Sequence, residues 1–129
     1  MTIKSFRDLF VWQTAMDLAT EVYAVTRGFP RSETYGLMSQ LQRAAVSIAS
    51  NIAEGHGRRS TAEFLRSLMI AMGSLAELET QVMLAERLNY LDSAGASNLL
   101  EKANEIGRMV RSLHSKLQGR IRPALATSH

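Results

Sequence analysis

The sequence predicts an all-α protein: a single domain built as an antiparallel, up-down-up-down four-helix bundle. Apolar residues recur every three or four positions in four separate stretches, the spacing that aligns side chains along one face of an α-helix. The alternating pattern of β-strands is nearly absent, and both prolines, Pro30 and Pro123, lie where a helix would already have ended. Only a few residues separate the stretches, so consecutive helices must pack as antiparallel neighbours.

The first helix is predicted to begin near Arg7 or Asp8 and to end at Gly28. Glycine is common at the C-terminal end of a helix, and the ring of Pro30 prevents the helix from continuing. The apolar face of this helix is expected to consist of Trp12, Ala15, Met16, Ala19, Val22, Tyr23 and Thr26.

The second helix is predicted to open after Ser32 and to break in the segment Gly55-His56-Gly57. Glu33 is well placed near the positive end of the helix dipole. The helix is rich in alanine and serine, whose small side chains allow a neighbouring helix to approach closely. Its apolar stripe is Leu37, Leu41, Ala44, Ile48 and Ile52.

The third helix is predicted to begin with a capping box from Ser60 to Glu63 and to stop before Asn89. Four-three spacing, typical of a bundle seam, joins Phe64, Leu68, Ala71, Leu75, Leu78, Val82 and Ala85. A second apolar row beside it consists of Leu65, Met69, Met72, Ala76 and Met83. This row either completes the core or meets another subunit. Because a long exposed apolar strip is costly in a monomer, we expect oligomerisation.

The fourth helix is predicted to be capped by Asp92 or Ser93 and to fade at Gly119 and Pro123. Its seam is Leu99, Ala103, Ile106, Val110, Leu113 and Leu117. The bundle domain is therefore expected to span residues 1–123, and residues 124–129 are expected to form a disordered C-terminal tail.

The bulk properties of the chain limit its class. A length of 129 residues is that of one domain able to bury a core. The absence of cysteine excludes a disulfide framework and a thiolate metal site. Neither a secretory signal peptide nor an uninterrupted apolar stretch of roughly 20 residues, as a membrane span requires, is recognisable. We therefore expect a cytoplasmic protein with no membrane partner.

The positive charge of the chain is modest and is carried mostly by arginine. The formal net charge is +3, the pI is about 9.7, and 12 of the 15 cationic side chains are arginine. Because a guanidinium group forks onto phosphate and stacks on bases, this bias favours binding to a nucleic acid. The alternative is that arginine decorates a solvated helix surface.

Basic residues gather at the turn between the second and third helices and along the fourth helix. The later part of the fourth helix carries no acidic residue, although charge that complements the C-terminal end of a helix dipole explains this pattern equally well. Since no aromatic residue interleaves with the cations of the fourth helix, phosphate contacts are expected rather than base stacking. The candidate nucleic-acid contacts are Arg58, Arg59, Arg66, Arg108, Arg111, Lys116 and Arg120.

Residues with catalytic or metal-binding chemistry form no recognisable constellation. Neither His56 nor His114 is preceded by the glutamate, three residues earlier, that metal sites in helix bundles use, and His129 lies in the tail. Glu77 and Glu79 diverge on the helix surface, and no Gly-x-Ser-x-Gly motif is present. We therefore expect a protein that is not an enzyme, has no catalytic residues, and uses neither a metal ion nor a cofactor.

A stripe of polar residues runs along the second helix beside its apolar stripe. It consists of Gln40, Arg43, Ser47, Asn51 and Glu54. The stripe is either a solvated face or a hydrogen-bonded network between helices or subunits, in which Arg43 and Asn51 donate and Glu54 accepts. A buried network of this kind would specify one packing register more than it would add stability.

Three segments resemble the small four-helix bundle proteins encoded in intervening sequences of bacterial 23S rRNA genes. Together they cover roughly residues 6 to 91. The first contains Leu9-x-Val11-Trp12-Gln13-x-Ala15, followed by Tyr23 and Phe29-Pro30. The second is Glu33-x-Tyr35-Gly36-Leu37-x-x-Gln40-Leu41-x-Arg43-Ala44-Ala45-x-Ser47-Ile48-x-x-Asn51-Ile52-Ala53-Glu54-Gly55. The third runs from Glu63-Phe64 through Ala71-x-Gly73-Ser74-x-x-Glu77-Leu78-Glu79-Thr80 to Leu91.

The resemblance implies an antiparallel bundle that assembles into a ring, with a homopentamer as the leading option. The family is also similar to the accessory variability protein of diversity-generating retroelements, which associates with a reverse transcriptase and with RNA through a basic surface. The sequence therefore predicts a non-enzymatic, oligomeric RNA-binding bundle. The alternative is a protein-interaction scaffold for a polymerase or reverse-transcriptase-like partner, with no direct RNA binding.

Overall fold

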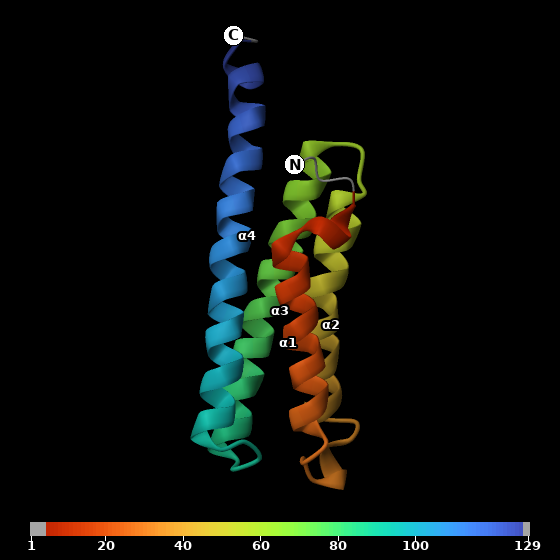
Figure 1. Cartoon of the computed structure of the whole chain (residues 1–129), viewed down its shortest axis with the longest axis vertical. Coiled ribbons are helices and arrows are strands. Elements are labelled where there is room, and N and C mark those ends of the chain that lie inside the picture. The colour runs from red at the N-terminus through yellow and green to blue at the C-terminus, as the bar shows by residue number, and fades with distance from the viewer. Residues whose placement is uncertain (1–4, 128–129) are drawn as a thin grey trace.

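The computed structural model describes residues 5–127, with side chains described as far as Ile121. It has four α-helices, α1 (Phe10–Thr26), α2 (Leu37–His56), α3 (Thr61–Arg87) and α4 (Ser93–Thr127). Two short 3-10 helices, η1 (Phe6–Asp8) and η2 (Arg31–Glu33), precede α1 and α2. The chain passes down α1, up α2, down α3 and up α4 (Figure 1), and no strand occurs among residues 5–127. The predicted fold class is confirmed.

The four helices enclose one apolar core. α1 and α3 each pack against both α2 and α4, and the α2–α3 pair makes the most extensive contact. Each helix contributes fully buried leucines, such as Leu18, Leu41, Leu78 and Leu99. The predicted seams of α2 and α3 are buried, apart from the half-buried Phe64 at the beginning of α3.

The buried face of α1 is rotated from the predicted one. Met16 and Tyr23 are exposed, whereas Val11 and Leu18, which the prediction omitted, are buried. A spacing of three and four admits two neighbouring stripes on the same helix, and both are apolar in α1. The choice between them is made by packing against α2 and α4, which the sequence of α1 alone does not contain.

Both N-terminal helix boundaries lie later than predicted, because a 3-10 turn replaces the first turn in each case. Ser5 caps η1 by accepting a hydrogen bond from the Arg7 amide at 3.2 Å, and α1 begins only at Phe10. α2 likewise begins at Leu37, and Glu33 lies outside it. The Glu33 carboxylate still satisfies the helix start, since its Oε1 accepts a hydrogen bond from the Leu37 amide at 3.0 Å.

The helix caps around α3 follow the predicted positions. The Ser60 hydroxyl accepts a hydrogen bond from the Glu63 amide at 3.1 Å. After α3, Asn89 has φ 63°, and the amide of Tyr90 donates to the Ala85 carbonyl at 2.9 Å, which is a Schellman motif closed by asparagine. Asp92 then caps α4 by accepting from the Gly95 amide at 2.6 Å. Sharp caps on both sides keep the α3–α4 connection short.

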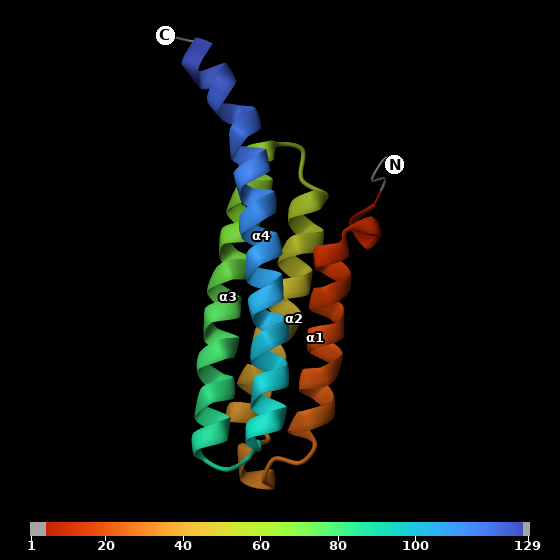
Figure 2. The same ribbon diagram turned by 60° about the vertical axis from the view of Figure 1, so that its left-hand side comes forward.

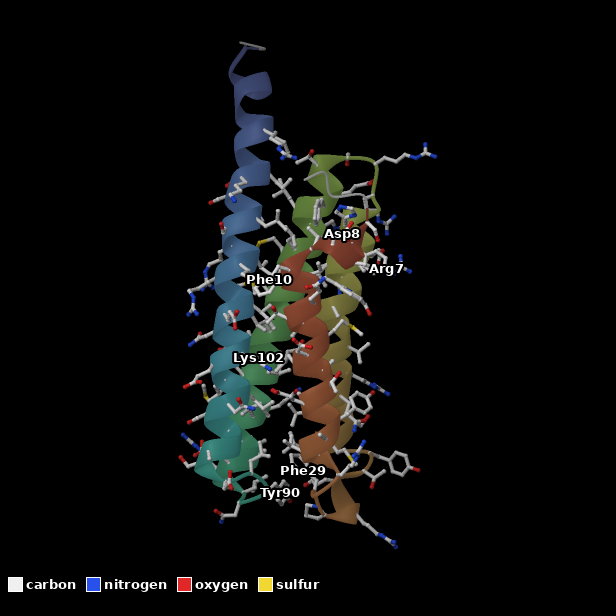
Figure 3. All side chains as sticks on the ribbon, in the orientation of Figure 1. Arg7, Asp8, Phe10, Phe29, Tyr90 and Lys102 are labelled. Carbon is white, nitrogen blue, oxygen red and sulfur yellow. The ribbon has the colours of Figure 1, made fainter. Side chains whose placement is uncertain are left out.

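The two interhelix connections at the lower end of Figure 1 are fastened together. The Tyr90 hydroxyl donates to Glu33 Oε2 at 2.9 Å, and the rings of Phe29 and Tyr90 lie 5.4 Å apart (Figure 3). Hydrogen bonds from the Leu37 amide and then from Tyr90 lower the pKa of Glu33. The bond to Glu33, together with partial burial, raises the pKa of Tyr90.

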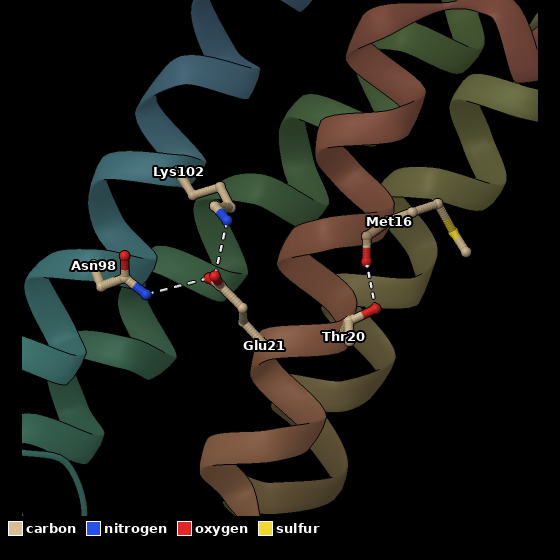
Figure 4. Close-up of polar contacts among 5 residues, drawn as sticks. All are labelled: Met16, Thr20, Glu21, Asn98 and Lys102. Atoms are coloured by element: carbon tan, nitrogen blue, oxygen red, sulfur yellow. Dashed lines mark hydrogen bonds and ion pairs between the residues drawn. The ribbon is translucent and has the colours of Figure 1, made fainter.

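A polar clamp joins the first and last helices. Lys102 Nζ on α4 lies 2.8 Å from Glu21 Oε1 on α1, and Asn98 Nδ2 donates to the other carboxylate oxygen at 3.3 Å (Figure 4). The side chains of Lys102 and Glu21 are partly buried. The clamp therefore closes the bundle at the contact between the two helices that are farthest apart in sequence.

α4 extends farther than predicted. It continues past Gly119 and Pro123 to Thr127, because one proline removes a single hydrogen bond and the alanine and leucine residues after it favour a helix. Its last turns project beyond the α2–α3 connection (Figure 2). Residues 128–129 of the expected tail lie outside the described part of the chain, and the expected boundary at residue 123 stays a prediction.

Candidate nucleic-acid interface

A groove opens at the end of the bundle that carries the α2–α3 connection. We name it the end groove; its volume is about 490 Å³. Its lining comes from the η1–α1 junction, the end of α2, the α2–α3 connection, the beginning of α3 and the later half of α4. The lining residues are Leu9, His56, Arg58, Arg59, Ser60, Thr61, Phe64, Leu113, Leu117 and Arg120.

Three of the predicted cations meet at the end groove. Arg58 and Arg59 extend from the α2–α3 connection, and Arg120 comes from α4, about sixty residues later in the sequence. All three are exposed. Arginine residues that line one depression suit the binding of phosphate oxygens, each of which can accept several hydrogen bonds.

Arg58 also has a partner within the chain. Its guanidinium pairs with the carboxylate of Glu54, one turn earlier, and both side chains are about half exposed. An exposed pair at this spacing contributes only about 0.3–0.5 kcal/mol. A phosphate group can therefore compete with Glu54 for Arg58 at little cost.

The rest of the end-groove lining is largely apolar and aromatic, which was not predicted from the sequence. Leu9, Phe64, Leu113 and Leu117 line it, and the ring of His56 meets the ring of Phe64 edge to face with centroids 5.9 Å apart. Phe64 was assigned to the α3 seam, whereas it lies half-buried at the margin of the core. The available signal was its position one turn inside α3, five residues after Arg59.

The remaining predicted cations are placed elsewhere. Arg66 lines a separate depression of about 370 Å³ that it shares with Arg58 and Asn51. Arg108 lines a depression on α4 together with the acidic Glu101 and Glu105.

The candidate cations of α4 do not all lie on one side of the helix. Nine residues separate Arg111 from Arg120, which is about two and a half turns and places them on opposite sides of the helix. Lys116 is exposed one turn before Arg120. Of the α4 cations whose side chains the structure describes, only Arg120 lines the end groove.

The polar stripe of α2 is divided between one interhelix contact and the surface. Asn51 Nδ2 donates to the carbonyl and hydroxyl oxygens of Ser47, at 2.8 and 3.1 Å. The Ser47 hydroxyl in turn lies 2.8 Å from that of Ser74 on α3, a partner that the sequence analysis did not name. Gln40, Arg43 and Glu54 are exposed and stand apart from this contact.

Arg43 lines a depression of about 390 Å³ between α2 and α3. Gln40, Ser47, Ser74, Glu77 and Gln81 share its lining. Among the described residues, Arg43 has no hydrogen bond or ion pair, and the buried Oε1 of Gln81 accepts none. The single chain thus leaves a donor and an acceptor unused in the same depression.

The outer face of α3 is apolar. Over 18 residues α3 is long and apolar enough to resemble a membrane-spanning helix, yet only 33% of that window is buried. Of the second row, Leu65 and Met72 pack against the core, whereas Met69, Ala76 and Met83 face outward. The large exposed apolar side chains of α3 and of Leu88, the residue that follows it, are between 45% and 58% exposed. They are Met69, Ile70, Met83, Leu84 and Leu88. We name these five the α3 face.

Metal-ligating side chains do not cluster in the described part of the chain: no three of its histidine, aspartate and glutamate residues are grouped so that they could hold an ion. The end groove contains one histidine and no carboxylate. Its lining offers hydrogen-bond donors, cations and apolar surface, which is chemistry for binding an anion attached to an apolar or aromatic group.

Comparison with known proteins places the fold and the family. A crystal structure of a protein of unknown function from the S23 ribosomal protein family of Bacteroides thetaiotaomicron is 22% identical to this chain. The TM-score is 0.73, with 81% of this chain and 97% of that chain covered, and at this identity the likeness shows the fold alone. No curated protein matches the sequence. The model of the family described as 23S rRNA-intervening sequence protein matches residues 7–112. The chain therefore belongs to the 23S rRNA-intervening sequence protein family.

Proposed function

We propose that this protein is a non-enzymatic, oligomeric bundle that binds RNA through the end groove. The observation that carries the proposal is the convergence of Arg58, Arg59 and Arg120 from two distant parts of the sequence. A solvated helix surface has no need to gather cations at one depression. The family description, which names an intervening sequence of 23S rRNA, supports RNA as the nucleic acid. A cytoplasmic location belongs to the same proposal, because it depends on that partner.

Self-association is the second element of the proposal, and the α3 face supports it. Apolar side chains that are about half exposed near both ends of α3 are unfavourable in water, and contact with another copy would bury them. The resemblance to ring-forming relatives favours a homopentamer. Cyclic symmetry would place every copy's end groove on the same side of the ring, so that one RNA could contact several grooves.

Binding of the purified protein to structured RNA, single-stranded RNA and duplex DNA, measured by fluorescence anisotropy across a salt series, tests the function. We expect RNA to bind at physiological salt, with the logarithm of affinity falling linearly with the logarithm of salt concentration. Replacement of Arg58, Arg59 and Arg120 by glutamine should flatten that slope. Arg31→Gln, at the opposite end of the bundle, is the matched control and should leave the slope unchanged.

Absence of binding by all three nucleic acids near physiological salt would overturn the proposal, as would equal and weak binding of all three. A flattened slope in the separate variant Arg108→Gln/Arg111→Gln, with the end-groove variant unaffected, would move the RNA site to the earlier part of α4.

A protein-interaction scaffold is the second candidate function, and the α3 face is the observation that favours it. A polymerase or reverse-transcriptase-like partner could cover that face in place of another copy of the chain. Tight binding to such a partner by a protein with no RNA affinity would select this function. RNA binding that persists while the α3 face is occupied only by copies of the chain would select the first.

A further inference from the structure

We infer that the end groove is a pocket for one unpaired RNA base, so that the protein prefers single-stranded or looped RNA to a continuous duplex. The pocket presupposes the proposed RNA binding and specifies which kind of RNA is bound. Its lining combines two kinds of side chain: Arg58, Arg59 and Arg120 are cationic, whereas Leu9, Phe64, Leu113 and Leu117 are apolar or aromatic. A surface for duplex phosphates alone needs only the first kind.

The size of the end groove suits a nucleotide. Its volume of about 490 Å³ falls within the range of roughly 300–1,000 Å³ that small-molecule sites occupy. The apolar lining includes the buried Leu117 and the half-buried Phe64 and Leu113. A base that enters would cover the exposed parts of Phe64 and Leu113. The polar sugar and phosphates would remain at the rim beside the arginines.

The aromatic ring of the groove is held in place before any ligand arrives. His56 packs edge to face against Phe64 with an interplanar angle of 89°. On the α2 side, Phe64 Cδ1 would lie only 2.9 Å from a Cβ atom at position 55, so Gly55 is what allows the ring to rest against the α2 backbone. A fixed ring loses little conformational freedom when a base stacks on it.

The cationic lining residues match the phosphates on either side of an inserted base. Arg58 and Arg59 are adjacent in the α2–α3 connection, and Arg120 lines the groove from α4. The backbone of an unpaired nucleotide can follow such a curved path, whereas a duplex holds its bases stacked and paired, and extruding one is costly. The combination therefore selects loops, bulges and single strands.

Three RNA probes of equal length separate base binding from phosphate binding. They are a single-stranded oligouridine, the same strand with abasic ribose-phosphate residues at its centre, and a blunt duplex. With the full chain at constant salt, we expect the oligouridine to bind on the order of tenfold more tightly than the abasic strand, since one base stacked on an aromatic side chain contributes about that much.

Matched variants separate the contribution of the aromatic lining residue from that of the three arginines. Phe64→Leu, which keeps an apolar side chain of similar bulk, should remove the difference between the oligouridine and the abasic strand while leaving the salt dependence unchanged. The Arg58→Gln/Arg59→Gln/Arg120→Gln variant should weaken all three probes and lower the salt slope by about 2, at about 0.7 for each of three phosphates on a single strand. Tyr35→Leu removes a ring that is 96% exposed at the opposite end and should change nothing.

Equal affinity of the wild-type protein for the oligouridine and the abasic strand would overturn the base pocket while leaving RNA binding intact. Failure of every probe to bind would instead overturn the proposed function. If Phe64→Leu fails to fold, as judged by its circular dichroism, the affinities of the wild-type protein for the oligouridine and the abasic strand still test the base pocket. A 2-aminopurine placed at the centre of the strand provides a second readout in the wild-type protein. Its fluorescence should fall on binding if the base stacks, and unchanged fluorescence in the bound state would contradict the pocket.

Discussion

Gly55 lies inside α2, facing the first turns of α3, at a position with no room for a side chain. A Cβ atom there would lie 2.6 Å from Ser67 Cβ, closer than real Cβ contacts allow. A helix break was predicted in Gly55-His56-Gly57, because glycine lowers helix propensity, and α2 does end at His56. Gly55 itself is still helical, and it permits the close approach of α3.

We expect Gly55→Ala to destabilise the protein by about 1–3 kcal/mol, even though alanine is the better helix former, because overpacking a close interhelix contact outweighs propensity. Urea unfolding followed by circular dichroism measures the change. Gly119→Ala is the control, since a Cβ at that position meets nothing within 4 Å, and it should be neutral or slightly stabilising. A more stable Gly55→Ala protein would contradict the close contact.

The bond between Glu33 and Tyr90 makes a pH-dependent contribution to stability. The pKa of Glu33 is lowered from its usual value of 4.5, so its contribution is present above that pH and is lost as pH falls through the folded-state pKa. The pKa of Tyr90 is raised from 10.0, so its contribution is present below pH 10 and is lost as pH rises through the folded-state pKa. Glu33→Gln should therefore lower the midpoint of thermal unfolding at pH 7, and the effect should shrink as the pH falls below 4.5. An effect that stays constant as the pH falls until the wild-type protein unfolds would show that the charge is not involved.

Among single residues, the caps were predictable and the site was not. Ser60 and Asp92 are local signals, because each cap bonds to an amide three residues later in the chain. Arg58, Arg59 and Arg120 were named from charge alone, without any indication that they meet. Phe64 was hidden because its spacing also fits the α3 seam.

α3 and α4 show which properties of a helix depend on the neighbouring helices and residues and not on its own periodicity. The seam of α3 was predictable from periodicity, but which half of its second row faces outward depends on where α2 and α4 lie. The end of α4 was placed too early, because glycine and proline were taken as stops in a region where neighbouring residues still favour helix.

We expect the wild-type protein to be oligomeric and the double variant Ile70→Glu/Leu84→Glu to be monomeric, since two carboxylates on the α3 face would have to lose water in an interface. Analytical ultracentrifugation gives the stoichiometry. Because both side chains are about half exposed in the single chain, the variant should keep its helical circular dichroism. Phe10→Glu, at an exposed position on α1, is the control. A monomeric wild-type protein would sink the self-association proposal.

The clamp between α1 and α4 has a measurable coupling. Lys102→Ala should cost about 1 kcal/mol of unfolding free energy, the upper range for a partly exposed ion pair, because Glu21 keeps only its bond to Asn98. A double-mutant cycle with Glu21→Ala isolates the pair. A coupling energy of zero would mean that the two helices are held by apolar packing alone.

For the whole molecule, the sequence determined the architecture because helical periodicity and short connections are local properties. It did not determine the end groove, which exists only once α2, α3 and α4 meet at one end of the bundle. The relative placement of distant segments is a property of the folded chain, so the candidate site could be assembled only from the structure.

Assembly and RNA binding should be linked at this scale. A long single-stranded RNA that spans several end grooves should lose at least tenfold in affinity when Ile70→Glu/Leu84→Glu separates the subunits, because the second contact is then no longer intramolecular. A short oligonucleotide that fills one groove should bind equally well to both forms. Equal loss for both lengths would show that the substitutions damage the groove itself.

The projection of α4 past the bundle gives the end groove two walls of unequal firmness. Leu117 is the last buried residue of α4 among the side chains described to Ile121, so the turn that carries Arg120 packs less closely than the earlier turns of the helix. The opposite wall is anchored in the contact between α2 and α3. Amide hydrogen exchange should therefore be fast after Leu117 and slow around Ser67. The width of the groove therefore depends on the end of α4, which can fray. An anion that bridges α4 and the α2–α3 side of the groove would slow amide exchange in α4 after Leu117.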